Sequence, residues 1–245
     1  LRTMLRIATC QMTSGPDIGA NVQIAESLIR KAAREGANLA LLPEMFTIMS
    51  NDPKDVLRLA EQYQDGPVQR IMSGLAKSLG IWIAAGTMPL KTDDPHRVTN
   101  TMLVYNAFGQ EAARYDKIHL FSYEGQQERY DESELYVGGH KTVSFNLPLE
   151  NGLDIRIGLA VCYDPAVPAA VPPSERHRLL PAPGCLYHEH RKGPLGSIAA
   201  RSSYRKPKLR SFRRTSRTLF LRPCFLGALL RRRSLGHRDQ QTQRT

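Results

Sequence analysis

The regular pattern of apolar residues stops near residue 164, and this limits what the chain can fold into. Up to Asp164, apolar runs of strand length alternate with segments of helical periodicity. Beyond it, residues 165–245 contain 9 of the 16 prolines, and no segment sustains the period of a strand or a helix for long. We therefore expect a folded domain over residues 1–164 and a poorly ordered tail over 165–245.

The balance of basic and acidic residues also changes after Asp164. Residues 165–245 hold 18 of the 34 Lys and Arg residues but only 3 of the 23 Asp and Glu residues. The formal net charge of +11 therefore describes the tail and not the domain before it. Taken as a genuine segment, the Arg-rich tail leaves open a protein that binds nucleic acid or an anionic membrane surface.

Cysteine spacing and hydropathy exclude several other classes. The four cysteines, Cys10, Cys162, Cys185 and Cys224, lie far apart without a CxxC pair, so the sequence indicates neither a disulfide framework nor a zinc site. No apolar run approaches the length that spans a bilayer, and no secretory signal pattern is present. We expect a cytoplasmic protein with no membrane partner.

The first 164 residues predict a layered α/β fold. Two helices are expected, one carrying Val22 to Ala32 and ending at Gly36, and one within 65–80 that starts at Pro67 and ends at Gly80. Strands are expected at 5–10, 38–44, 81–87, in a hairpin over 99–117, and at 142–145 and 153–161. Because βα units are mixed with an antiparallel hairpin, an α/β sandwich fits better than a purely parallel sheet.

Three polar residues follow strand-like runs and carry a possible chemistry. Glu44, Lys117 and Cys162 lie far apart in sequence, and a fold that aligns strand ends would bring them together. Cys162 would be a nucleophile and Glu44 the base that takes its proton. Lys117 would stabilise the negative oxygen of a tetrahedral intermediate, with the backbone N–H of Tyr163 as a second donor.

Each residue also has an ordinary structural interpretation. Cys162 fits a small core residue at a strand end. Glu44 fits an acid at a helix N-terminus, and Lys117 a solvated charge at a strand end. Spacing alone leaves both sets of interpretations open.

Three segments of the chain resemble a known family. LLPEMF around Glu44, RYDKIHLF around Lys117 and GLAVCYD around Cys162 are similar, in the same order, to the signature segments of the nitrilase (carbon-nitrogen hydrolase) superfamily. CQM at 10–12 and TNTMLVY at 99–105 add to the resemblance, which covers residues 5–164. KIHLF and LPEMF look most like the omega-amidase and deaminated-glutathione-amidase branch.

The resemblance implies a fold, a reaction and further roles. The fold would be an αββα four-layer sandwich, incomplete after residue 164. The reaction would be hydrolysis of a small carboxamide to an acid and ammonia through a thioester on Cys162, without a metal or organic cofactor. Glu132 and Tyr163 would position the substrate, although Glu128 and Glu134 lie close to Glu132 and a solvated loop acid is the alternative for it. The assembly would be a homo-oligomer.

The resemblance ends after Asp164, and a shifted reading frame accounts for the tail. If each codon takes the last two bases of one residue and the first base of the next, Pro165–Pro173 can encode LRFPQLFR. By the same shift Tyr187–Arg201 can encode TTSTGKAHWEVLLR, and Phe225–Gly236 can encode SWGHSFVVDPW. All three resemble the family's continuation, in family order. We therefore interpret residues 165–245 as an out-of-frame translation, which makes nucleic-acid binding the less favoured alternative.

A frameshift has physical consequences. The missing part would cover a second sheet and close the pocket behind the nucleophile, so we expect this chain to be poorly soluble or impaired as an enzyme. A noncatalytic relic of the family that partners an intact homologue is a further possibility.

Overall fold

The computed structural model describes the backbone and side chains of residues 5–124, 129–149, 154–162 and 164, and the backbone of 179–182 and 208–211. The helices are α1 (Ile18–Arg34), α2 (Pro53–Leu59) and α3 (Pro67–Leu79), with one 3-10 turn, η1 (Glu132–Glu134). The strands are β1 (Arg6–Thr9), β2 (Leu39–Leu41), β3 (Trp82–Lys91), β4 (Val98–Tyr105), β5 (Glu111–Asp116), β6 (Ser122–Glu124), β7 (Arg129–Asp131), β8 (Tyr136–Val137), β9 (Ser144–Pro148), β10 (Asp154–Val161), β11 (Leu179–Ala182) and β12 (Lys208–Ser211).

Local sequence signals set the ends of the two longer helices. Asp17 caps α1, because its side chain accepts a hydrogen bond from the backbone N–H of Ala20 at 3.1 Å. Pro67 occupies the first turn of α3, and Gly80 ends the helix in the left-handed conformation at φ 63°. The sequence predicted both helices and their glycine stops correctly.

The main sheet mixes parallel and antiparallel pairing. Among the described residues its order is β12-β1-β2-β3-β4-β5, and β8 pairs with β4. β1, β2 and β3 run parallel, whereas β3, β4 and β5 form an antiparallel meander. A common site can therefore draw residues from the carboxyl ends of β1 and β2 and from the segment that follows β5.

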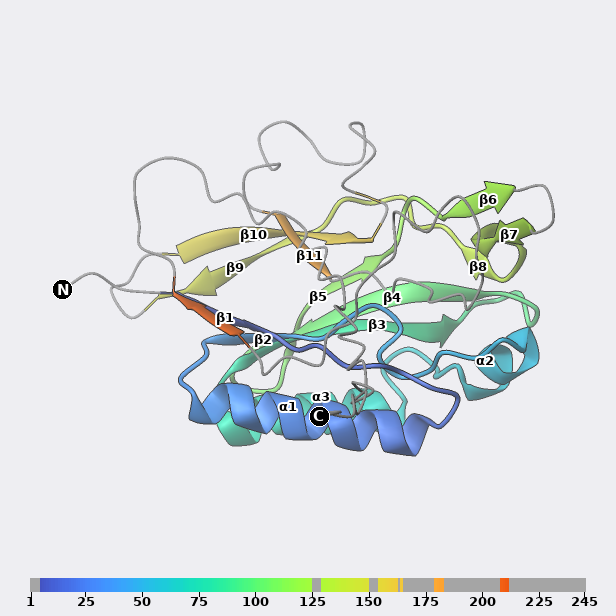
Figure 1. Cartoon of the computed structure of the whole chain (residues 1–245). Coiled ribbons are helices and arrows are strands. Elements are labelled where there is room, and N and C mark those ends of the chain that lie inside the picture. Colours follow the sequence, from blue (N-terminus) through green and yellow to red (C-terminus); the bar gives the residue numbers. More distant parts are fainter. Residues whose placement is uncertain are drawn as a thin grey trace, which may run out of the picture. The chain divides into compact units, whose positions relative to one another are not determined.

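Each face of the main sheet has its own hydrophobic core. α1 and α3 cover one face, where Ile29 and Met72 pack against strand residues such as Ile83. β9 and β10 cover the other face in a second sheet with β11, and Trp82 of β3 stacks on Phe145 of β9 with ring centroids 5.3 Å apart. Figure 1 shows this order of a helical layer, the main sheet and the second sheet. The fourth, helical layer of the expected αββα sandwich falls outside the described residues.

Several short elements were not expected from the sequence. α2 buries only Val56 and so lacks an apolar stripe, and β6, β7 and β8 have two or three residues each. Two four-residue strands also occur within the tail, where β11 pairs with β10 and β12 with β1. The remaining tail, including its predicted poor order, lies outside the described residues.

Candidate active site

Glu44 lies just beyond β2 in a loop that the neighbouring strand β3 holds in place. The Thr87 hydroxyl accepts a hydrogen bond from Met45 N at 2.7 Å, and Thr87 N donates to Pro43 O at 3.3 Å. β3 carries a register shift at this point, and a Cβ on Gly86 would come within 1.8 Å of Pro43 O. Only glycine allows this close approach, so the bulge in β3 positions the Glu44 loop.

Lys117 follows β5 and is buried between two carboxylates. Its Nζ lies 3.0 Å from Glu44 Oε1 and 2.8 Å from Glu132 Oε2, and the residue is 1% exposed. Burial acts to lower the pKa of Lys117, but the charges of Glu44 and Glu132 outweigh it and the net pKa is raised. The ammonium is therefore charged throughout the physiological range. Its burial excludes the alternative of a solvated strand-end lysine.

Glu132 is the glutamate of its segment that reaches this cluster. It is 6% exposed, and its Oε2 also accepts a hydrogen bond from Phe121 N at 2.8 Å. Burial raises the pKa of Glu132, whereas the Lys117 charge opposes that rise. Glu134 is exposed and Glu128 lies outside the described residues. The alternative of a solvated loop acid at Glu132 is therefore wrong.

Asn100 also contacts Glu44 and was not predicted. This β4 residue is buried, and its Nδ2 donates to Glu44 Oε1 at 2.9 Å. The signal that could have identified Asn100 is an amide side chain inside a strand whose eight residues are all buried. A buried amide needs a hydrogen-bond partner. Asn100 and Lys117 thus both hold the same oxygen of the Glu44 carboxylate, Oε1.

Cys162 lies at the end of β10 with a left-handed backbone. Its φ of 47° is uncommon for a residue with a side chain. Burial and then the Glu44 charge raise the pKa of its thiol to about 12, helped by a hydrogen bond to Glu44 and opposed by Lys117. Because the residue as a whole is exposed, the contact with Glu44 is the better supported cause of this shift. The thiol is protonated at neutral pH.

The structure thus brings Glu44, Lys117, Glu132 and Cys162 together, as the sequence predicted. Tyr163 lies outside the described residues. Among the described residues no group of His, Cys, Asp and Glu could hold a metal ion, and no helix is long and apolar enough to cross a membrane.

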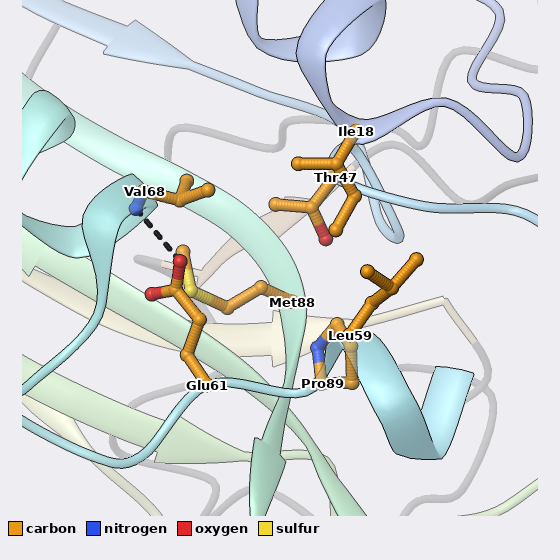
Figure 2. A pocket seen from close by; sticks show the side chains of 7 residues that line it. All are labelled: Ile18, Thr47, Leu59, Glu61, Val68, Met88 and Pro89. Carbon is orange, nitrogen blue, oxygen red and sulfur yellow. Dashed lines mark hydrogen bonds between the residues drawn. The ribbon is translucent and has the colours of Figure 1, made fainter. Parts of the chain in front are cut away.

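A small pocket lies elsewhere, between α1, the ends of α2 and α3, and β3. Figure 2 shows its lining and the hydrogen bond from Val68 N to Glu61 Oε1, which measures 2.7 Å. The lining residues are Ile18, Thr47, Leu59, Glu61, Val68, Met88 and Pro89. None of the four clustered residues lines it, so we do not assign the chemistry to this pocket.

Comparison with known proteins agrees with this fold. The architecture is that of nitrilase-superfamily structures. The family model described as carbon-nitrogen hydrolase matches residues 6–173, and the chain belongs to this family.

Curated relatives carry an amidase name. The deaminated glutathione amidase of Yersinia enterocolitica is 32% identical over 161 residues, which are 64% of this chain and 54% of that protein. The Homo sapiens protein of the same name is 33% identical over 167 residues, covering 66% of this chain and 49% of that protein. The chain thus spans about half the length of the curated relatives it matches.

Two solved structures illustrate the shared fold. The Caenorhabditis elegans NitFhit protein has a TM-score of 0.60 at 30% identity, covering 69% of this chain and 40% of that chain. A cysteine-to-alanine mutant of the amidase from Nesterenkonia, in complex with butyramide, has a TM-score of 0.61 at 23% identity, covering 77% of this chain and 68% of that chain.

Proposed function

We propose that the clustered residues form the site of a hydrolase that converts a small carboxamide to an acid and ammonia. The observation that carries this proposal is the buried Lys117 held between Glu44 and Glu132 beside the Cys162 thiol. The amide substrate class follows from the amidase names of the curated relatives. An omega-amide of a dicarboxylic acid is the form of substrate we expect.

The first half-reaction would form a thioester. Because the thiol is protonated at neutral pH, Glu44 takes its proton as the sulfur attacks the amide carbon and the carbonyl electron pair moves onto oxygen. The C–N bond then breaks, and Glu44 returns the proton to the departing nitrogen, which leaves as ammonia.

The second half-reaction would release the acid. A water molecule attacks the thioester carbon and gives its proton to Glu44, and the S–C bond breaks as that proton returns to sulfur. This step restores the thiol on Cys162. The whole cycle consumes one water and needs no cofactor.

Lys117 would stabilise the oxyanion in both half-reactions. An ammonium has three N–H donors, and two of them lie on Glu44 and Glu132. The third is available for the negative oxygen, with Tyr163 N–H as the second donor that we predict there. Glu132 would hold Lys117 in this orientation and help position the substrate.

We also propose that the chain as written turns over poorly, because its tail is an out-of-frame translation. The three family-like segments that the shifted frame can encode, in family order, support this. The small amide is the partner we expect, in a homo-oligomer, and we favour no nucleic-acid role for the tail.

Ammonia release tests the proposal. We would compare the 245-residue chain, verified by mass, with a version whose tail is read in the shifted frame, using monoamides of dicarboxylic acids. We expect release from the frame-restored version, loss of release on Cys162→Ala, and little release from the chain as written. Release that survives Cys162→Ala would overturn the proposed reaction, whereas robust release from the written chain would overturn only its impairment.

A further inference from the structure

We propose that Asp164 is a positioning residue that ties the Cys162 turn to the segment carrying Lys117. Asp164 is completely buried, and both oxygens of its carboxylate accept hydrogen bonds. Oδ2 accepts from Val161 N at 2.9 Å and from the Tyr115 hydroxyl at 2.6 Å. Oδ1 accepts from His119 N at 2.8 Å and lies 3.2 Å from His119 Nδ1.

These donors come from two segments that are far apart in sequence. Val161 immediately precedes Cys162, so its hydrogen bond closes the turn that presents the thiol. Tyr115 and His119 lie two residues before and two residues after Lys117. One carboxylate therefore fixes the distance between the segment of the nucleophile and the segment of the cation.

The backbone conformation of Cys162 explains why hydrogen bonds to Asp164 are needed next to it. A residue with a side chain keeps a positive φ only when surrounding contacts hold it there, and Cys162 has φ 47°. Asp164 supplies such a contact directly after the turn. Burial and then the Asp164 charge raise the pKa of Tyr115, so its hydroxyl remains a neutral donor to the carboxylate.

The thiol's contact with Glu44 provides a readout. If Asp164 holds the Cys162 turn, loosening it will separate the thiol from Glu44 and lower the pH at which the thiolate forms. A change that only reduced overall stability would not move the pH profile of a thiol in the folded state. Asp164→Asn is a suitable change, because an amide has one acceptor oxygen and cannot satisfy all of these donors.

The test is the rate of alkylation of Cys162 by iodoacetamide from about pH 7 to about pH 10, measured by peptide mass mapping of the 245-residue chain. Buried Cys10 reports on folding in the same sample, because it reacts only when the core opens. We expect Asp164→Asn to move the Cys162 profile to lower pH, with a rate at about pH 8 that rises up to about tenfold for each unit of the move. Asp154→Asn, an exposed change on the same strand, should leave the profile unchanged.

An unchanged Cys162 profile in Asp164→Asn, with Cys10 still protected, would overturn the inference. If Asp164→Asn exposes Cys10, Tyr115→Phe decides, since it removes one donor and keeps the ring. A smaller move in the same direction then supports the inference, and a parental profile overturns it.

The inference rests on the proposed role of Cys162, but its test needs no substrate turnover. A shifted profile, combined with no ammonia release by the frame-restored version, would contradict the proposed function and leave the positioning role of Asp164 standing.

Discussion

At the scale of residues, the site depends on one positive charge between two buried carboxylates. Lys117 contacts Glu44 and Glu132 within 3.0 Å, and all three side chains are almost completely removed from water. Carboxylates left unpaired in such a place are costly, because burial disfavours their charged form. Lys117 therefore stabilises the folded protein as well as the chemistry proposed for it.

Lys117→Met keeps the unbranched stem of the side chain and removes the ammonium group with its charge. We expect a loss of about 3–5 kcal/mol in the free energy of unfolding at about pH 7, measured by urea denaturation. Without Lys117, the pKa of Glu132 rises further above its unfolded value. In the Lys117→Met protein, the stability that depends on protonated Glu132 is fully present below the unfolded pKa of Glu132 and is lost as the pH rises through its folded pKa. The loss of stability relative to the parent should therefore be smaller at about pH 5 than at about pH 7.

Lys91→Met is the matched control, since Lys91 is an exposed residue at the end of β3. It should change the free energy of unfolding by less than about 0.5 kcal/mol. Equal effects of the two substitutions, or a Lys117→Met deficit independent of pH, would contradict this account of the cluster.

At the scale of elements, the position of Glu44 depends on the bulge in β3. Gly86→Ala would place a Cβ 1.8 Å from Pro43 O, so the Glu44 loop or the strand must shift. We expect a loss of about 1–3 kcal/mol in the free energy of unfolding, measured by chemical denaturation, together with reduced ammonia release by the frame-restored chain.

Gly74→Ala in α3 supplies the opposite case. A Cβ there meets nothing within 4 Å, and alanine favours a helix interior. This substitution should therefore stabilise the protein by roughly 0.5–1 kcal/mol. A Gly86→Ala protein as stable as the parent would show that the loop does not need the close approach.

Elements with a long apolar period were predictable, and short ones were not. α1 and α3 carry clear stripes and glycine stops, whereas α2 buries a single residue and forms through the Asp52 cap and Pro53. The residues of the candidate site also fall into those that the sequence predicted and those that it did not. Signature segments identified Glu44, Lys117 and Cys162, and the resemblance pointed to Glu132 with Glu128 and Glu134 as alternatives. Asn100 and the links of Asp164 depend on which strands lie side by side, which local sequence does not specify.

At the scale of the whole molecule, residues 174–245 are the C-terminal part of the chain that the family model does not match. We predict that the nucleotide sequence near codon 164 contains a lost or gained base, and that the shifted frame encodes the LRFP-like continuation. Sequencing the gene measures this directly. An intact frame with codons incompatible with that continuation would contradict the prediction and make the Arg-rich tail a genuine segment.

The central claim is that Cys162 is the nucleophile of an amide hydrolase. Mass spectrometry of the Cys162 peptide, after acid quenching of the frame-restored chain with a dicarboxylic monoamide, tests it most directly. We predict an acyl mass on that peptide, absent in Cys162→Ala and greatly reduced in Glu44→Gln. Ammonia release without any acyl mass on Cys162, or an acyl mass only on another residue, would contradict the claim.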